Sequence, residues 1–396
     1  MLKKTILILG AGIYQVPLIN KSKEMGFTTV VASTKGNYPG INIADIFEDV
    51  DTSNIQGILA IAKKYKIDAT LTTGTDVAVP AIGAIVDELG LNGTGFNAAM
   101  RSMNKVLMKG TFESHNIPTA KFIVSDSIEG VFSAAEIIGF PLLVKATDSS
   151  GSRGITMVKN ESEISKAWTN AINISKNKEI IVEEYLIGVE YGAQAIIHGD
   201  EVVEVFLHND SITKLPYLTP IGHSMPGNFH YSVVNKTKFV IGKAVTALGI
   251  RDTIANIDLM LVDNEPMIIE IGARMGATCL PEIISLFSGF DAYEHMLKLS
   301  LGEESKLPKS YPKKANAGLL LRSNKSGILK SIQIPKEILG HPSLYKLTLD
   351  KKPGDRINEF KIGPDRLGDI IVTGDSWENA EMIAEELSSK ININII

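Results

Sequence analysis

The segment from Leu142 to Val158 constrains the fold more than any other part of the chain. It contains an apolar run with Lys145 near its end, a Ser/Gly loop at 148–154, and a second run in which apolar residues alternate. Two strands joined by such a loop form a hairpin whose tip can fold over a polyphosphate and offer backbone N–H groups, hydroxyls and a cation. An ordinary hairpin with one exposed lysine fits this segment equally well, so the rest of the chain must decide.

Acidic residues in a second pair of runs indicate a metal site. Asp258 and Glu270 each lie in an apolar run, and a turn-forming segment at 263–266 separates the two runs. If the runs form one hairpin, two carboxylates lie on an otherwise apolar sheet, where charge is costly unless a partner neutralises it. A hard divalent cation meets that need, and Arg274 is placed to bind an anion beside it. The alternative is a buried carboxylate paired with an arginine.

A third run, Ile180–Leu186, is followed by Gly188 and Glu190. A strand that continues into a short connection exposes backbone groups able to bind an adenine edge, and a carboxylate beyond it can accept hydrogen bonds from ribose hydroxyls. Alone this signal is weak, because glutamate pairs on solvated edges are common.

Together, and in this order, these segments resemble the ATP-grasp superfamily. The resemblance covers residues 1–300 and is expected to include the tail. It implies that ATP activates a carboxylate as an acyl phosphate, that an amine or other nucleophile attacks, and that ADP and phosphate leave. The motifs that carry it are Met103-Asn104-Lys105, Asn116-Ile117-Pro118-Thr119, Phe140-Pro141-Leu142-Leu143-Val144-Lys145, the Ser/Gly loop, Glu183-Glu184-Tyr185-Leu186 with Glu190, and Glu270-Ile271-Gly272-Ala273-Arg274.

The resemblance also implies roles for single residues, with ATP and Mg²⁺ as the cofactors. The residues expected to bind ATP are Lys105 and Lys145 at the phosphates, Ser150, Gly151 and Ser152 over the β- and γ-phosphates, Glu183, Glu184, Tyr185 and Leu186 at the adenine, and Glu190 at the ribose. Asp258 and Glu270 are expected to bind magnesium, and Arg274 to stabilise the transferring phosphoryl group or the acyl phosphate.

Two positions depart from the superfamily's pattern. Many members carry asparagine two residues after the second metal carboxylate, whereas this chain has Gly272, so one metal contact must come from elsewhere. Asp258 is shorter than the glutamate often found at its position. Neither change looks disabling, because magnesium commonly retains water ligands.

Composition agrees with a soluble globular enzyme. At 396 residues the chain can form two or three domains, and its net charge of -5, without any basic tract, argues against nucleic-acid binding. Cys279 is the only cysteine, which excludes an intrachain disulfide and favours a reduced, cytoplasmic setting.

The basic start and the short apolar run at 1–10 favour a buried first strand over a signal peptide, and no apolar span is long enough to cross a membrane.

The chain divides into three blocks that predict an α/β and α+β architecture. Strand-like and helical patterns alternate in 1–101, which predicts a doubly wound pre-ATP-grasp domain. Its Gly10-Ala11-Gly12 turn lacks the third glycine of a dinucleotide fingerprint, with Gln15 at that position, while Gly74-Thr75-Asp76 could line the substrate side. Residues 102–305 are expected to form the α+β ATP-grasp domain, and 306–396 a small closing α+β domain.

Substrate identity depends on the segment 214–226, which resembles the amino-acid ligase branch. Its His223 could orient a carboxylate or act as a base, although a lone histidine is more often simply packed; His208 and His230 are weaker candidates. We therefore predict a carboxylate–amine ligase that acts on small, amino-acid-like molecules. A homodimer is compatible with this prediction. The alternatives are a purine-biosynthesis-type or carbamoyl-phosphate-type enzyme that activates bicarbonate or formate, and a non-catalytic nucleotide-binding regulator.

Overall fold

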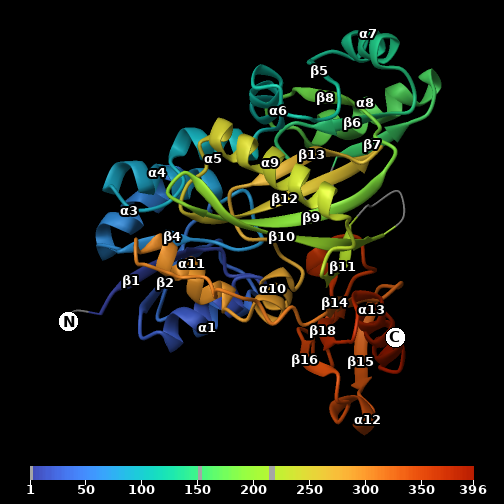
Figure 1. The fold of residues 1–396 in the computed structure, drawn as a ribbon. Helices are drawn as coiled ribbons and strands as arrows, with labels where there is room; N and C mark the ends of the chain where they lie inside the picture. The colour runs from blue at the N-terminus through green and yellow to red at the C-terminus, as the bar shows by residue number, and fades with distance from the viewer. Residues whose placement is uncertain (1–2, 150–153, 214–218) are drawn as a thin grey trace.

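The computed structural model describes residues 3–149, 154–213 and 219–396. Its strands form a parallel sheet near the N-terminus, a small antiparallel sheet, a long antiparallel sheet that runs through the middle of the molecule, and a short C-terminal sheet (Figure 1). Among the described residues, none of the helices combines the length and apolar character that a membrane crossing requires.

The N-terminal sheet is parallel, in the order β3-β2-β1-β4, which confirms the doubly wound pattern. Gln15 fills the turn after the first strand, since its Oε1 accepts a hydrogen bond from Gly12 N (2.9 Å) and its Nε2 donates to Thr73 O. The elements of this block are β1 (Thr5–Leu9), α1 (Val16–Glu24), β2 (Thr28–Ser33), α2 (Pro39–Ile43), β3 (Ile46–Asp49), α3 (Ile55–Tyr65), β4 (Ala69–Leu71), α4 (Val79–Leu89) and α5 (Phe96–Met103).

The small antiparallel sheet has the order β5-β8-β6-β7 and contains the hairpin predicted at 142–158. Its apolar face packs on two helices in a buried cluster. Its elements are β5 (Phe122–Ser125), α7 (Ile128–Ile138), β6 (Leu142–Ala146), β7 (Ile155–Val158), the 3-10 turn η1 (Glu161–Glu163), α8 (Ile164–Ile174) and β8 (Ile180–Glu184), and it follows α6 (Lys105–Ser114).

The long sheet has eight strands in the order β13-β12-β9-β10-β11-β14-β18-β16. The hairpin predicted around the 263–266 turn is β12–β13, and it pairs Asp258 directly with Glu270. The elements are β9 (Val189–His198), β10 (Glu201–Ile212), β11 (Pro220–Met225), α9 (Tyr231–Leu248), β12 (Thr253–Val262), β13 (Glu265–Gly272), α10 (Leu280–Ser288), α11 (Ala292–Ser300), β14 (Asn316–Leu321), β16 (Leu344–Leu349) and β18 (Gly368–Thr373).

The C-terminal block is continuous with this sheet. Strands β14, β18 and β16 extend the sheet that begins in the middle block, so the sheet itself passes through the expected boundary at 305. The domain limits 1–101, 102–305 and 306–396 stay a prediction. The other elements of this block are β15 (Gly327–Gln333), α12 (Lys336–Leu339), β17 (Arg356–Ile357), the 3-10 turn η2 (Gly363–Asp365), α13 (Trp377–Ser389) and β19 (Asn392–Ile395).

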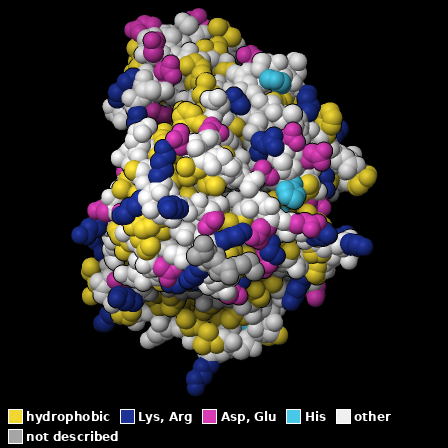
Figure 2. Space-filling view, turned by 90° about the vertical axis from the view of Figure 1, so that its left-hand side faces the viewer, with side chains coloured by type: hydrophobic (Ala, Val, Ile, Leu, Met, Phe, Trp, Pro, Cys, Tyr) yellow, Lys and Arg dark blue, Asp and Glu magenta, His cyan; other side chains and the backbone are white. Residues whose placement is uncertain are grey.

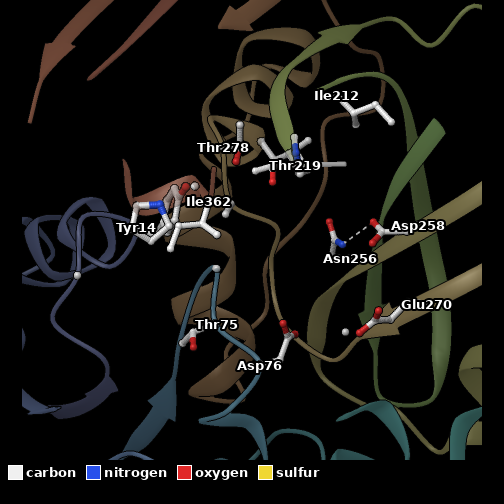
Figure 3. A pocket seen from close by; sticks show the side chains of 18 of the residues that line it. Tyr14, Thr75, Asp76, Ile212, Thr219, Asn256, Asp258, Glu270, Thr278 and Ile362 are labelled. Carbon is white, nitrogen blue, oxygen red and sulfur yellow. Dashed lines mark hydrogen bonds between the residues drawn. The ribbon is translucent and has the colours of Figure 1, made fainter. Parts of the chain in front are cut away.

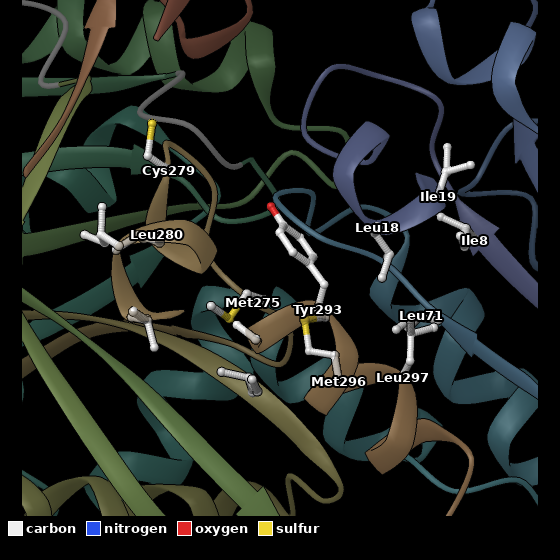
Figure 4. Close-up of a cluster of buried hydrophobic side chains, with 14 of the residues drawn as sticks. Ile8, Leu18, Ile19, Leu71, Met275, Cys279, Leu280, Tyr293, Met296 and Leu297 are labelled. Carbon is white, nitrogen blue, oxygen red and sulfur yellow. The ribbon is translucent and has the colours of Figure 1, made fainter. Parts of the chain in front are cut away.

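An apolar cluster joins the N-terminal block to the middle of the chain (Figure 4). Side chains such as Leu18 and Leu71 from the first sheet and its helix pack against Met275, Tyr293 and Leu297 from the segment that contains α10 and α11. Burial of such a shared cluster is strongly favourable, so the loops that follow β1 and β4 are held at a constant position relative to the long sheet.

The face of the molecule shown in Figure 2 carries lysine and arginine side chains interspersed with aspartate and glutamate. This is the pattern of a mixed-charge surface rather than of a continuous field of one sign.

A glycine beside the predicted adenine segment tests this fold. A Cβ on Gly188 would lie 2.2 Å from the backbone oxygen of Leu261, so Gly188→Ala must displace either the β8–β9 connection or β12. We expect a loss of about 1–3 kcal/mol of stability, seen as a lower melting temperature, together with weaker ATP binding by calorimetry.

The matched control is Gly242→Ala, because an added Cβ at that position in α9 meets nothing within 4 Å. Alanine is the better helix former, so its melting temperature should stay the same or rise. Equal melting temperatures for Gly188→Ala and wild type would show that the connection is not packed as described.

Candidate functional site

A cavity of about 1600 Å³ lies where the small sheet, the long sheet, the N-terminal loops and the C-terminal block meet (Figure 3). Every predicted site residue within the described ranges lines it: Lys105, Lys145, Glu183, Glu184, Tyr185, Leu186, Glu190, His223, Asp258, Glu270 and Arg274. Three predicted ATP-binding residues lie outside the described residues: Ser150, Gly151 and Ser152. Residues 214–218 of the predicted substrate segment 214–226 also lie outside them.

Lys105 connects the hairpin loop with the predicted metal pair. It is the first residue of α6, because the side chain of Asn104 caps the helix by accepting hydrogen bonds from two backbone N–H groups. The Lys105 Nζ donates to Ser149 O at 2.7 Å and lies 3.4 Å from Glu270 Oε2. This cation therefore faces both the loop and the carboxylate across the cavity.

Glu183 forms a buried ion-pair cluster with two lysines. Its Oε2 lies 3.0 Å from Lys145 Nζ and 3.3 Å from Lys109 Nζ, and the residue is 2% exposed. Burial alone would raise the pKa of Glu183, but the two lysines lower this pKa to about 2. Its carboxylate thus pairs with Lys145 and Lys109. The resemblance had instead placed Glu183 with the adenine-binding residues.

Lys109 was missed by reasoning from the sequence. It follows Lys105 by four residues and so lies on the same face of α6, a spacing that could have revealed it. Its Nζ donates to Thr119 Oγ1 at 2.6 Å, and burial lowers its pKa.

The segment that follows β8 lines the cavity with Glu184, Tyr185 and Leu186, and Glu190 stands at the start of β9. Burial, and then the charge of Asp210, raises the pKa of Glu190 to about 7, with Lys145 acting in the opposite direction. A carboxyl group in this state can either accept or donate a hydrogen bond near neutral pH.

Asp258 and Glu270 face each other across the β12–β13 ladder. Burial, followed by the charges of Glu270 and other nearby carboxylates, raises the pKa of Asp258 to about 8. Partly buried, opposed carboxylates with oxygen donors suit a hard divalent cation, which would relieve their repulsion. These residues therefore fit Mg²⁺.

Asn256 supports this pair from the neighbouring position on β12. It pairs in register with Gly272, the position at which the resembled superfamily often has asparagine. Its Nδ2 donates to Asp258 Oδ1 at 3.0 Å, and its Oδ1 accepts from Gln194 Nε2 at 2.5 Å (Figure 3 shows the first bond). Asn256 thus holds Asp258 in place, and only the strand register reveals it.

Arg274 is anchored by the N-terminal block. Its Nη2 lies 2.9 Å from both carboxylate oxygens of Asp76, a residue of the predicted Gly74-Thr75-Asp76 loop. Its Nε is buried without a hydrogen-bond partner among the described residues. The guanidinium is therefore oriented beside Glu270 with donor capacity left for an anion.

The histidines differ in their placement. His223 and His208 both contact the carboxylate of Asp210 inside the cavity, at 2.6 Å and 2.7 Å from its Oδ1. His230 instead caps the N-terminus of α9. Asp210 was not singled out from the sequence, because its proximity to His223 arises from the pairing of β10 with β11.

Comparison with known proteins places the chain in a family. The family model described as phosphoribosylglycinamide synthetase, ATP-grasp (A) domain, matches residues 103–212. The crystal structure of phosphoribosylglycinamide synthetase from Anaerococcus prevotii is 30% identical, with a TM-score of 0.82 and full coverage of both chains. The chain belongs to the ATP-grasp superfamily. It is an ATP-dependent ligase, and ATP and Mg²⁺ are its cofactors.

Three further matches come from two branches of ATP-grasp ligases. The model described as L-amino acid ligase C-terminal domain 2 matches residues 319–395, and the L-amino acid ligase structure from Bacillus licheniformis has the same fold (TM-score 0.83, 18% identity, 100% and 99% of the two chains covered). A formate-dependent phosphoribosylglycinamide formyltransferase from Sulfurisphaera tokodaii is 24% identical over 418 residues, which cover 98% of this chain and 96% of that protein. The predicted ATP-grasp fold is confirmed.

The buried ion-pair cluster of this ATP-grasp ligase generates a test. Glu183→Gln leaves Lys145 and Lys109 buried without their counter-charge, which should cost about 3–5 kcal/mol of stability. Because the pKa of Glu183 is lowered to about 2 from the ordinary 4.5, its contribution is complete above pH 4.5 and is lost as the pH falls towards 2. Melting temperatures of both proteins between pH 3 and 7 measure this.

The control is Glu184→Gln, which removes the same charge from the next residue, where the side chain is half-buried and forms no ion pair among the described residues. Its melting temperature should match that of wild type. Equal stability of Glu183→Gln and Glu184→Gln would refute the cluster's proposed contribution.

Proposed function

We propose that this ATP-grasp ligase joins the carboxylate of one amino-acid-like molecule to the amine of another through an acyl phosphate, with release of ADP and phosphate. The observation that carries the proposal is the convergence of two lysines, two opposed carboxylates and an arginine in one cavity that also contains an Asp–His pair. The match of residues 319–395 to an L-amino acid ligase domain supports the amino-acid branch.

In this proposal, Lys105 and Lys145 bind the ATP phosphates. Each ammonium group lies beside a carboxylate, with Glu270 3.4 Å from Lys105 and Glu183 3.0 Å from Lys145. The connection from Glu184 to Leu186 binds the adenine through its backbone, and Glu190 binds the ribose.

Asp258 and Glu270 would hold Mg²⁺, which supplies charge neutralisation at the phosphates when it is bound. Asn256 keeps Asp258 in position for this, through the 3.0 Å bond to its Oδ1. Arg274, oriented by Asp76, stabilises the negative charge that develops as the phosphoryl group moves to the substrate carboxylate.

A second candidate function is a reaction of the formate- or bicarbonate-activating type, with a phosphorylated amine as substrate. Lys351 and Lys352, between β16 and β17, and Arg356, the first residue of β17, line the cavity and form no ion pair among the described residues. Such cations suit an additional anionic group on the substrate. The formyltransferase from Sulfurisphaera tokodaii is a relative of this kind.

A homodimer and a cytoplasmic location complete the proposal. One neighbour with the same fold is described as a biotin carboxylase domain dimer, and Cys279 is buried with a free thiol, as expected in a reducing compartment.

Coupled ADP release tests the function directly. Amino acids, small carboxylates and phosphorylated amines are offered in pairs with ATP and Mg²⁺, with and without bicarbonate or formate. Amine-dependent release of ADP and phosphate without the one-carbon acids supports the amino-acid ligase. AMP and pyrophosphate as products would contradict acyl-phosphate chemistry, and ATP binding without any turnover would favour the regulator.

The opposed carboxylates of the proposed metal site generate a further prediction. Glu270→Gln removes an anionic oxygen ligand with little change in size, so turnover should fall by about 100-fold or more while the fold survives. The control is Glu265→Gln on the same strand, since Glu265 is exposed and pairs with Lys236 away from the cavity. Near-normal turnover of folded Glu270→Gln would show that β12–β13 does not hold the metal.

The proposed acyl phosphate generates another prediction. With ATP and the correct carboxylate but no amine, hydroxylamine should intercept the intermediate as a hydroxamate, because an acyl phosphate is electrophilic. Arg274→Ala should depress hydroxamate formation more than ATP binding, since its charge matters most as the phosphoryl group transfers. Calorimetry and a colorimetric hydroxamate assay measure the two quantities.

The control is Arg251→Ala, because that side chain is 52% exposed and lies outside the cavity. Equal losses of ATP binding and hydroxamate formation in Arg274→Ala would remove the catalytic role of this arginine.

A further inference from the structure

A single carboxylate oxygen accepts hydrogen bonds from two imidazoles in the cavity. Asp210 Oδ1 lies 2.7 Å from His208 Nδ1 and 2.6 Å from His223 Nδ1. His208 and Asp210 are two residues apart on β10 and so share a face of the sheet, and Asp210 pairs in register with His223 on β11. Their side chains are between 2% and 9% exposed. The sheet register thus assembles a buried His–Asp–His group.

This arrangement selects the protonation pattern of both rings. Burial alone would raise the pKa of Asp210, but the neighbouring histidines hold this pKa well below its usual range. An ionised carboxylate only accepts hydrogen bonds, so each ring must carry a proton on Nδ1. In a neutral imidazole the lone pair then lies on Nε2.

His208 is enclosed by the sheet. Gly192 on β9 pairs with His208, and a Cβ there would lie 2.1 Å from the Cε1 of the ring. The Nε2 of His208 points to the side-chain amide of Gln194, at 3.4 Å. Burial also lowers the pKa of His208, which favours the neutral ring. His208 can therefore orient Asp210, but its lone pair is turned away from a ligand.

His223 presents the open lone pair. Its ring lines the cavity, and within the described ranges its Nε2 forms no hydrogen bond. A base must lie within hydrogen-bond reach of the proton that it takes, and this nitrogen alone of the pair meets that condition for a ligand in the cavity.

We propose that Asp210, held by His208, is a positioning residue that presents Nε2 of His223 as the base for the amine substrate. The inference rests on the proposed carboxylate–amine ligation. An amine arrives as an ammonium ion without a lone pair, so one proton must leave before it can attack.

The ammonium nitrogen gives one proton to Nε2 of His223, and the lone pair that is freed attacks the acyl carbon, forming the C–N bond. The C–O bond to phosphate breaks with its electron pair on oxygen. The second proton from nitrogen goes to the departing phosphate, which leaves as hydrogen phosphate, and the His223 proton is released to solvent.

The three groups are also close enough to hold a metal ion, since their ligand atoms lie within 4.8 Å of one another. Such an ion would have to displace the Nδ1 protons of both rings, because these nitrogens point at Asp210. The hydrogen-bonded group satisfies all three partners without that cost.

The test compares two nucleophiles on the same enzyme. An ordinary amine needs a base, whereas hydroxylamine is already neutral near pH 7 and does not. In Asp210→Asn and in His223→Gln we expect amide formation to fall by about 100-fold or more, while hydroxamate formation from the same carboxylate and ATP stays near the wild-type rate. His208→Gln can still donate to Asp210 and should lose less.

The control is His115→Gln, since His115 is exposed at the end of α6 outside the cavity; both reactions should be unchanged. Equal loss of both products in folded Asp210→Asn, or full amide formation by His223→Gln, would overturn the inference. The inference would also be overturned if purified wild-type protein contained one transition-metal ion per chain and Asp210→Asn contained none. If wild type forms neither product with any substrate pair, the proposed function fails instead, and this inference fails with it.

Discussion

The like charge of Asp258 and Glu270 is the constraint on which the rest of the site depends. The β12–β13 ladder places the two carboxylates opposite each other, and burial together with their repulsion raises the pKa of Asp258 to about 8. Lys105 partly offsets this charge from 3.4 Å away. The lysine lies there because α6 begins at that residue, after a side-chain cap by Asn104. A local helix start and a strand register therefore together create the proposed cation site.

Two cations that line the cavity are each paired with a carboxylate. Glu183 holds Lys145, and Asp76 holds Arg274. The second pair spans two blocks of the chain, and the apolar cluster of Figure 4 stabilises that contact. Burial of a charge is costly without such partners, so these supports allow charged groups to remain inside the cavity. Truncating a supporting carboxylate is therefore expected to impair the site without removing a ligand contact.

Much of this could be predicted from the sequence, because the predicted hairpins combine period-two apolar runs with strong turn residues. Both hairpins and the alternating N-terminal pattern are confirmed. Lys109, Asn256 and Asp210 were missed because their partners, Glu183, Gln194 and His223, lie on other elements of the fold. Lys109 had one sequence signal, its four-residue spacing from Lys105. The C-terminal block was expected to form a small closing α+β domain; three of its strands also extend the long sheet, because the edge at β11 pairs with β14.

The long sheet also brings the two proposed parts of the site together. Five neighbouring strands carry the polar groups in order: Glu270 on β13, Asp258 and Asn256 on β12, Gln194 on β9, His208 and Asp210 on β10, and His223 on β11. Gln194 contacts both Asn256 and His208, and so connects the metal pair with the His–Asp–His group. The opposed carboxylates and the His–Asp–His group therefore keep a constant separation on one face of the sheet. The segments after β1, after β4 and between β16 and β17 also line the cavity, but they come from other layers and can differ among relatives without disturbing that face.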